Sequence, residues 1–339
     1  MIQLATLVEI AQKLNMSAST VSRVANEKGN VKEATRLKVL KALEAYGYAP
    51  DMTARGLKTG RTHTVGVIVP DISEPFFSSL LCGMEEAISK AQYKLLLCIS
   101  NEDARKEIAY LKYFAQNRIE GVILATVSPK NNPVHLEFIK NQNIIFIDNL
   151  PNMHFPFSAV ITDNALASKM AVTYLHSLGH RKIGTIAGKQ AETTGNDRLI
   201  GYQQTMMSLG LAAEGAMIQI GDFKESSGYM CMTQLLRDVP GLTAVYVASS
   251  QMTYGAVKAL TAAGKKIPDD ISVVGFDVHD PTGLISPGIT TLIQQENKMG
   301  RISSRLLLDA IEQKDGYTHQ KILLPPELVI KQSCRPIPH

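Results

Sequence analysis

The feature that most constrains the fold of this chain is a series of short apolar runs that begins after residue 63. Each run is long enough for one strand, and amphipathic segments separate the runs. Continuous β-branched runs of this kind are typical of parallel strands that helices cover on both faces. Two successive sets of four predict two doubly wound α/β lobes. In chain order the runs are TVGVIVP, YKLLLCIS, GVILAT and NIIFIDN, then KIGTIAG, AMIQIG, TAVYVAS and ISVVGFD.

The segment before these runs differs from them in charge. Residues 1–61 carry ten Lys and Arg against five acidic residues, a net charge of +5, whereas the rest of the chain carries 25 against 26, a net charge of −1. A small basic head on a nearly neutral body is expected when one segment meets a polyanion. The alternative is a basic surface that only faces water.

The head has helical periodicity from its start. Thr6 and Glu9 have the spacing of a capping box, and after the turn LNM a second helix begins with Ser17 as its expected N-cap and with Val21 and Val24 facing inward. The first helix has apolar residues at i, i+3, i+4 and i+7, namely Leu7, Ile10, Ala11 and Leu14.

A third helix is expected to begin at Lys32 or Glu33 and to end near Gly47, a C-cap glycine. Two short helices joined by a tight turn and braced by a third describe a helix-turn-helix module. The apolar residues that we expect along the third helix are Leu37, Leu40 and Leu43.

The second helix, in the stretch MSASTVSRVAN, is unusually rich in hydroxyl groups for a helix. With Val21 and Val24 inward, small and hydroxylated residues are left at its exposed N-terminal side, which is the side that enters the major groove in such modules. Small side chains allow close approach, hydroxyls bind phosphate, and Arg23 can donate to guanine O6 and N7. An ordinary Ser-rich surface helix is the alternative.

The whole chain resembles the lactose/galactose repressor family of bacterial transcription regulators. The motifs that carry the resemblance are TLVEIAQKLNMSASTVSRVAN, VKEATRLKVLKALEAYGYAPD, ARGLKTGRTHTVGVIVPDISEPFF and ISVVGFD. The resemblance implies a small all-α helix-turn-helix DNA-binding head over residues 1–49, a hinge helix and linker over 50–63, and an α/β effector-binding and dimerisation domain of two doubly wound, periplasmic-binding-protein-like lobes over 64–339. It implies a homodimer that binds double-stranded, palindromic operator DNA as a repressor. The lack of a signal peptide and of a membrane-spanning run predicts a cytoplasmic protein.

The same resemblance assigns DNA contacts. In the hinge, Leu57 corresponds to the apolar wedge that enters the minor groove. The hinge has about seven helical positions with Gly56 among them, so we expect it to be disordered off DNA and to fold on DNA. A plain linker fits the composition equally well. The expected DNA-binding residues are Thr6, Leu7, Ser17, Ala18, Ser19, Thr20, Ser22, Arg23, Asn26, Thr35, Ala54 and Leu57.

Candidate effector residues follow the predicted strands, because ligands of such sheets bind beyond the carboxyl ends of the strands. Carboxylates with an arginine suit vicinal hydroxyls, and aromatic faces suit a sugar ring. An Asp after a strand is also a common helix N-cap, and a Phe pair can serve packing alone. The candidates are Phe76, Phe77, Asn101, Asp148, Arg198, Phe223, Ser249, Ser250, Asp277 and Glu296.

Arg198 is the sharpest of these candidates. A cation early in a helix is not explained by the helix dipole, which favours anions there. We expect Arg198 to donate paired hydrogen bonds to a small polar effector, such as a sugar or sugar derivative, opposite Asp148 and beside Asp277. The alternative is a surface ion pair with Asp197 or Glu192. Ser249, Ser250 and Glu296 depart from the family's usual residues, so the effector need not be one of the familiar hexoses or nucleobases.

Other functional classes fit the sequence less well. The run GTIAGKQ has one residue too few for a phosphate-binding loop, and no G-x-S-x-G elbow is present, so we expect no enzyme, no cofactor and no metal. A solute-binding receptor is nearer in fold, but the basic head and the lack of a signal peptide disfavour it. No apolar run is long enough to span a membrane. We expect buried free thiols at Cys82, Cys98, Cys231 and Cys334.

Overall fold

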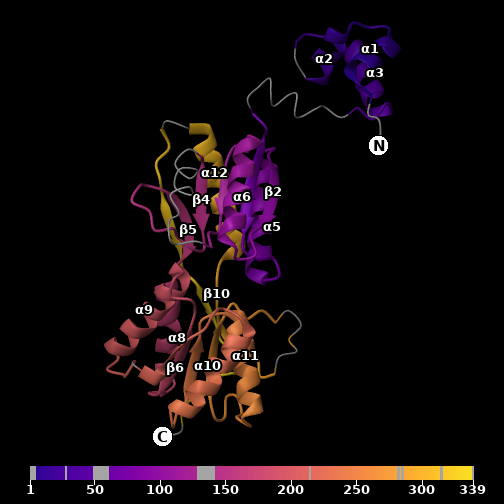
Figure 1. Cartoon of the computed structure of the whole chain (residues 1–339). Helices are drawn as coiled ribbons and strands as arrows, with labels where there is room; N and C mark the ends of the chain where they lie inside the picture. The colour runs from indigo at the N-terminus through magenta and orange to yellow at the C-terminus, as the bar shows by residue number, and fades with distance from the viewer. Residues whose placement is uncertain are drawn as a thin grey trace. The chain divides into compact units, whose positions relative to one another are not determined.

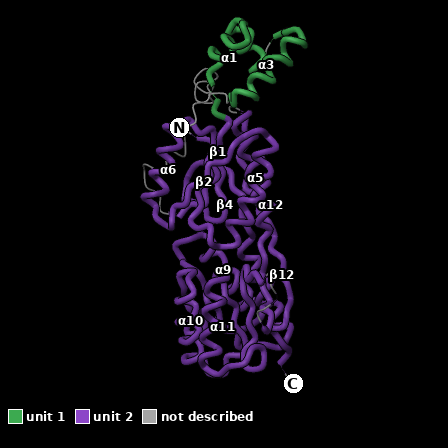
Figure 2. The backbone as a smooth tube through the Cα atoms, turned by 90° about the vertical axis from the view of Figure 1, so that its right-hand side faces the viewer, with its two compact units in different colours: residues 1–62 green, residues 63–339 purple. Residues whose placement is uncertain are grey.

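The computed structural model describes residues 5–26, 29–48, 61–127, 142–213, 215–280, 283, 286–313 and 316–337. The chain divides into two compact units, residues 1–62 and residues 63–339, which Figure 2 shows in different colours. The predicted hinge positions Pro50, Asp51, Ala54, Gly56 and Leu57 lie outside the described residues.

The first unit is the predicted three-helix head. Thr6 caps the first helix, where Glu9 returns a hydrogen bond in a complete capping box, and Ser17 caps the second. Val21 and Val24 are buried between the helices. The turn between the first two helices places Asn15 in the left-handed region, at φ 53°. The helices are α1 (Leu7–Leu14), α2 (Ala18–Ala25) and α3 (Glu33–Ala45).

The third helix begins and ends as expected, with Gly47 at φ +61° beyond its last turn. Leu43 is buried as predicted, but the other two predicted positions are not. Leu37 is 52% exposed and Leu40 is 42% exposed, whereas Val39 is fully buried. Positions 39, 42 and 43 face α1 and α2, and residues 37 and 40 lie on the other side of the helix. The prediction that Leu37 and Leu40 are buried is wrong, because the smaller Val39 and Ala42 occupy the core of the head in their place.

The second unit contains the two predicted lobes, each built on one six-stranded sheet. In lobe 1, α5 and α12 pack against each other on one sheet face and α6 covers the other face (Figure 1). The strand order is β11-β5-β4-β3-β1-β2, all parallel. The elements are β1 (Thr64–Val69), α5 (Pro75–Lys90), β2 (Lys94–Ile99), α6 (Ala104–Gln116), β3 (Val122–Leu124), β4 (Ile144–Ile147), β5 (Ser158–Thr162), α12 (Glu296–Gln313) and β11 (Lys321–Leu324).

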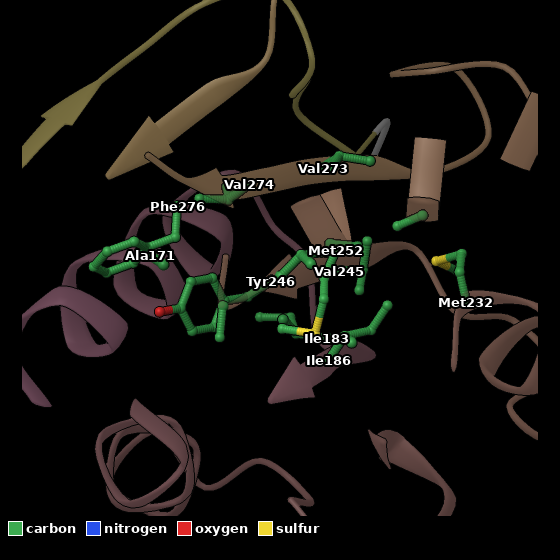
Figure 3. Packing of buried hydrophobic residues seen from close by; sticks show 14 of the residues in the cluster. Ala171, Ile183, Ile186, Met232, Val245, Tyr246, Met252, Val273, Val274 and Phe276 are labelled. Carbon is green, nitrogen blue, oxygen red and sulfur yellow. The ribbon is translucent and has the colours of Figure 1, made fainter. Parts of the chain in front are cut away.

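Lobe 2 places its sheet between the pair α8 and α9 and the pair α10 and α11 (Figure 1). The order is β12-β10-β9-β8-β6-β7, with β12 antiparallel to β10. Tyr246 and Phe276 are among the large side chains in its core (Figure 3). The elements are α8 (Asn164–Ser177), β6 (Ile183–Ala187), α9 (Thr193–Ser208), η1 (Gly215–Met217), β7 (Ile218–Ile220), α10 (Glu225–Asp238), β8 (Ala244–Val247), α11 (Ser250–Ala262), β9 (Ser272–Phe276), β10 (Thr290–Ile293) and β12 (Glu327–Val329).

The chain passes between the lobes three times: after β5, after β10 and after β11. The crossings are joined to one another by hydrogen bonds, since Thr162 donates to the Gln294 side chain and Gln295 donates to the Pro325 carbonyl at 2.7 Å. The crossings begin or end at β5, β10, β11 and β12, and none of these four strands is predicted from the sequence.

All eight predicted runs form strands, in the predicted sets of four.

The four cysteines are free thiols, as predicted, but only Cys231 is buried. Cys82 is exposed because α5 buries Leu80, Gly83 and Met84 and turns residue 82 away from the lobe. None of the helices in the described segments is long and apolar enough to cross a membrane.

Two glycines hold α12 close to α5, and this contact yields a test of the fold. A methyl group at Gly300 would overlap the backbone of Leu80, and one at Gly83 would overlap that of Asn297. Overpacking of this kind costs about 1–3 kcal/mol, so Gly300→Ala is expected to lower the free energy of unfolding of the second unit by that amount in urea titrations. Gly316→Ala, at an exposed glycine with open space around it, is the control and should change it by less than about 0.5 kcal/mol. Equal stability of the two variants would contradict the close packing.

Candidate functional site

The first candidate site is the exposed surface of α2 in the head. Ser17, Ala18, Ser19 and Arg23 are exposed, while Thr20 and Ser22 are partly buried. The helix therefore presents small side chains and one long cation on the side away from Val21 and Val24. Of the remaining predicted contacts, Thr6 and Asn26 are exposed, and Leu7 and Thr35 are partly buried.

Several of these hydroxyls already have partners within the head. The Ser17 hydroxyl accepts from the Thr20 backbone N–H at 3.2 Å and lies 2.9 Å from the Ser19 hydroxyl. Asn26 donates to the Ser22 carbonyl at 2.7 Å. Ser17 thus has a structural role as a helix cap. The predicted contacts Ala54 and Leu57 lie outside the described residues.

The second candidate site is a cavity of about 420 Å³ between the two lobes of the second unit. Residues after β1, β4, β6, β7, β8 and β9 line it, so the carboxyl ends of strands from both sheets meet there. Eight of the ten predicted effector residues line this cavity: Phe76, Phe77, Asp148, Arg198, Phe223, Ser249, Ser250 and Asp277.

Asn101 and Glu296 do not line the cavity. Asn101 follows a predicted strand, β2, whereas Glu296 follows β10, which was not predicted. Asn101 occupies an exposed turn at φ 52° and donates its backbone N–H to the Pro70 carbonyl at 3.0 Å. Glu296 is the first residue of α12 and is 8% exposed, with its carboxylate 3.5 Å from His279. It lies beside Asp277 and His279 and is not among the residues that line the cavity.

Arg198 lies on α9 and is only 5% exposed. Its Nε donates to the Asn164 side chain and one terminal nitrogen donates to the Ala248 carbonyl, each at 2.7 Å. The guanidinium carbon lies 3.5 Å from the centre of the Phe276 ring. Such burial excludes the surface ion pair with Asp197 or Glu192. Glu192 lies 3.4 Å from Lys189 instead.

The guanidinium of Arg198 has five N–H groups, and two of them are used by these partners. Within the described residues it makes no further hydrogen bond, so the remaining donors are available at the cavity. A buried cation of this kind needs acceptors or negative charge beside it.

Asp148 follows β4 and lies at the edge of the same cavity. Its carboxylate makes no hydrogen bond or ion pair in the described part of the chain. Loss of water raises its pKa to about 7, and the charges of Glu192 and Asp277 add to this, although Arg198 acts in the opposite direction. Asp148 is thus an acceptor without a donor.

Asp277 follows β9 and is 7% exposed. Burial raises its pKa to about 6, against the effect of two hydrogen bonds from Gln294. The Gln294 backbone N–H lies 3.0 Å from one carboxylate oxygen and its side-chain nitrogen lies 2.6 Å from the other. Because Gln294 also accepts from Thr162, Asp277 is joined to two of the interlobe crossings.

The aromatic residues form apolar walls. Phe223 lies across Gly188, where any side chain would overlap its ring. Phe76 and Phe77 pack edge to face with centroids 4.9 Å apart, and each is 7% exposed. Both belong to the core of lobe 1 and also line the cavity. They therefore pack the lobe and are also placed where a ligand could contact them.

Four of the residues that line the cavity hold left-handed backbone conformations. Phe223 has φ 69°, Asp148 has φ 60°, Glu102 has φ 58° and Asp277 has φ 50°. Asp adopts this conformation more readily than most residues, but for Phe it is costly. Costly conformations of this kind cluster at functional sites, where the surrounding structure holds them.

Sequence reasoning missed several residues at the cavity. Glu74 accepts a hydrogen bond from Ser250 across the lobes at 3.1 Å. Asn149 accepts from Thr193 and Thr194 of lobe 2 at 3.2 and 3.1 Å. Several of the residues that were not predicted lie next to, or within a few positions of, a predicted one, so a wider window around the strand ends would have found them. They include Glu74, Asn149, Thr194, Phe276 and Gln294.

Comparison with known proteins finds matches in both units of the chain. The family model of the bacterial regulatory proteins, lacI family, matches residues 6–51, and a periplasmic binding protein-like domain matches residues 172–334. The chain is 31% identical to the HTH-type transcriptional repressor PurR of Pectobacterium carotovorum subsp. carotovorum (strain PC1), over 99% of this chain and 98% of that protein. It is 31% identical to the HTH-type transcriptional regulator DegA of Bacillus subtilis (strain 168), over 98% of each.

Solved structures give the same result. A lac repressor dimer bound to operator and an anti-inducer has a TM-score of 0.87 at 24% identity, over 98% of this chain and 100% of that chain, which shows a common fold. A complex of the transcriptional regulator CelR with cellobiose has a TM-score of 0.73 at 29% identity, over 97% and 99%. A LacI family transcriptional regulator from Enterococcus faecium with bound ribose has 0.71 at 29% identity, over 81% and 100%.

The helix-turn-helix head, the two lobes and the full-length identity of 31% to PurR and to DegA lead to one conclusion. The chain belongs to the LacI family of bacterial regulatory proteins.

Proposed function

We propose that this protein is a DNA-binding transcriptional repressor whose affinity for its operator is set by a small, uncharged polyol such as a sugar. The observation that carries the effector class is that one cavity is lined by both Arg198 and Asp148. Arg198 has N–H donors that are not used within the described residues, and Asp148 is a carboxylate that accepts no hydrogen bond there. A sugar hydroxyl accepts from the first and donates to the second, which satisfies both.

The charge of the cavity favours a neutral ligand over an anion. Among the described residues that line it are seven carboxylates and two cations, Arg198 and Lys224. Lys189 is paired with Glu102 and Glu192, and Lys258 with Glu225, which leaves four of the seven without a lysine partner. A phosphate or a sugar acid would meet repulsion from these four in a partly dehydrated space, where electrostatic interactions are strong. The seven are Asp71, Glu74, Glu102, Asp148, Glu192, Glu225 and Asp277.

Two relatives of known structure support the sugar class, because regulators 29% identical to this chain were solved with cellobiose and with ribose. Phe223 and the Phe76–Phe77 pair offer the apolar surfaces on which the faces of a sugar ring pack. The curated relatives' names state no sugar, so this class remains our proposal.

DNA binding and dimerisation follow from the head and from the family. A net charge of +5 on residues 1–61 suits a polyanion.

A groove on lobe 1 lies between α5 and the edge strand β2 and is suited to a second copy of the chain. The apolar residues that line it are Leu81, Ile88, Tyr93, Leu95 and Leu97. The basic head and the repressor relatives disfavour a receptor without a DNA role. Binding to operator DNA would place the protein in the bacterial cytoplasm.

A thermal-shift screen of the full chain tests the effector class, because a ligand that binds only the folded state raises the melting temperature. Neutral sugars, sugar phosphates, sugar acids and nucleobases form the four arms. We expect stabilisation in the neutral-sugar arm. Stabilisation by sugar phosphates or sugar acids alone would overturn the charge argument, and stabilisation by nucleobases alone would replace the sugar class.

Arg23 is expected to read one base pair in each operator half-site. Arg23→Ala should weaken operator binding by about 1–3 kcal/mol and relax the preference at that base pair, because a bidentate contact to guanine is lost. Arg36→Ala, at an exposed arginine on α3, is the control and should leave base preference unchanged. Selection from a randomised operator library measures both, and an unchanged preference for Arg23→Ala would refute its assignment as a base reader.

Arg198 is expected to control the response to the effector. Arg198→Lys keeps the charge but loses the fork of paired donors, and should weaken effector binding by about tenfold or more, because charge-assisted hydrogen bonds are worth about 1.5–3 kcal/mol. Basal operator affinity should stay within a factor of about ten. Lys169→Ala, on the exposed face of α8, is the control in calorimetric titrations. An unchanged dissociation constant for Arg198→Lys would eliminate the ligand role.

Asp148 is expected to make effector affinity depend on pH. With its pKa near 7, the carboxyl is mostly ionised at pH 8 and mostly protonated at pH 6. A hydroxyl donor prefers the ionised form, so the affinity should fall about tenfold from pH 8 to pH 6. Asp148→Asn should bind weakly and without this pH dependence. A parent affinity that is flat over this range would remove Asp148 from the site.

The same raised pKa has a consequence for the unliganded protein. The folded state binds the proton more tightly than the unfolded state, so the contribution of Asp148 to stability is present at low pH and is lost as the pH rises through 7. Asp148→Asn should therefore melt higher than the parent at pH 8, by about 2–4 °C for each kcal/mol gained. The difference should shrink at pH 5, and a lower melting temperature at pH 8 would contradict the desolvation of Asp148.

A further inference from the structure

Three potential metal ligands meet at the edge of the cavity, on segments that belong to different lobes. Asp277 and His279 follow β9 of lobe 2, and Glu296 begins α12, which packs in lobe 1. One ligand atom from each lies within 4.8 Å of the others. The sequence shows no metal motif here, because the third ligand comes from another lobe.

Two of these atoms face each other and have no other partner in the described part of the chain. His279 Nε2 and Glu296 Oε1 are buried and form an ion pair at 3.5 Å, but neither makes a hydrogen bond of ordinary geometry. Glu296 as a whole is 8% exposed. A buried polar atom without a partner is costly, and such atoms are rare in native proteins unless an ion or water completes them.

The distance between these two atoms fits a shared metal ion better than a direct bond. They lie 3.5 Å apart, whereas a charge-assisted hydrogen bond between nitrogen and oxygen is about 2.7–2.9 Å long. Two ligands on a tetrahedral ion, each about 2.0–2.1 Å from it, are separated by about 3.3–3.4 Å.

We propose that Asp277, His279 and Glu296 form a site for a divalent transition-metal ion of the Zn²⁺ type. Imidazole with carboxylates suits such ions, whereas Mg²⁺ and Ca²⁺ prefer oxygen ligands alone. His279 and Glu296 are the nearer pair, and Asp277 reaches the ion through a small shift of its side chain or through a bound water.

The surroundings support these residues as ligands. Gln294 donates to both oxygens of Asp277 at 3.0 and 2.6 Å, and carboxylate ligands commonly have such hydrogen-bonded support. The Tyr254 hydroxyl donates to the His279 carbonyl at 3.2 Å, which fixes the loop after β9. A divalent cation would also offset the two buried carboxylates, Asp277 and Glu296.

The site has a consequence for regulation, because its ligands belong to both lobes. An ion held by Glu296 and His279 would tie the start of α12 to the end of β9, beside the crossing that contains Gln294. Metal binding would then favour one arrangement of the lobes, and metal and effector would change each other's affinity by the same factor.

Titration of the EDTA-treated full chain with Co²⁺ tests the site without any assay of DNA or effector binding. Co²⁺ in a tetrahedral site gives visible absorption, and Zn²⁺ should displace it at about one ion per chain. His279→Ala and Glu296→Gln should each weaken binding by at least about tenfold. His154→Ala, at an exposed histidine away from the cluster, should bind as the parent does.

The measurement can overturn the proposal in two ways. Absence of stoichiometric binding by the parent would show that His279 and Glu296 form a plain ion pair, and parent-like binding by both site variants would show that the metal is held elsewhere. Melting curves of the metal-free variants report whether each is folded. Should Glu296→Gln fail to fold, His279→Ala alone decides, since His279 has an exposed side-chain fraction of 30% and contributes little to the core.

Discussion

The effector domain depends on one buried cation, the guanidinium of Arg198. It stacks on Phe276 and donates to Asn164 and to the Ala248 carbonyl. A charge removed from water must be compensated locally, and two neutral acceptors and one ring do so only in part. Asp148 and Asp277 supply the opposite charge, and their raised pKa values show that dehydration outweighs this attraction for both. The cavity therefore has unused hydrogen-bond donors and acceptors with which the hydroxyl groups of a polyol can form hydrogen bonds.

Lobe architecture and most of the cavity follow from the sequence, because strand ends are marked by local signals. A β-branched run followed by Asp placed Asp148 and Asp277 correctly. Side-chain direction beyond the strand end has no such signal, which is why Glu296 was assigned to the cavity when it faces His279. In the head, Leu37 was assigned to the core because of its size, although helix geometry buries the smaller Val39.

The remaining errors concern contacts between distant segments. The strands β5, β10, β11 and β12 are short and lie at or beside the interlobe crossings, so their pairing depends on both sheets and not on local pattern. The bonds from Thr162 to Gln294 and from Gln294 to Asp277 join these crossings to the cavity wall. A ligand bound to Asp277 and Arg198, as we propose, would contact a residue bonded to the segments that connect the lobes, which is a physical route by which it could act on DNA binding.

The central claim is that the cavity and the DNA-binding head are energetically coupled, and reciprocal titration tests it most directly. Operator affinity is measured by fluorescence anisotropy with and without saturating effector, and effector affinity is measured by calorimetry with and without saturating operator. Linkage requires the two ratios to be equal, and typical couplings of about 1–3 kcal/mol correspond to about 5–150-fold. The account predicts equal ratios of at least about fivefold. An effector that binds the cavity with the same affinity in the presence and absence of operator would contradict it.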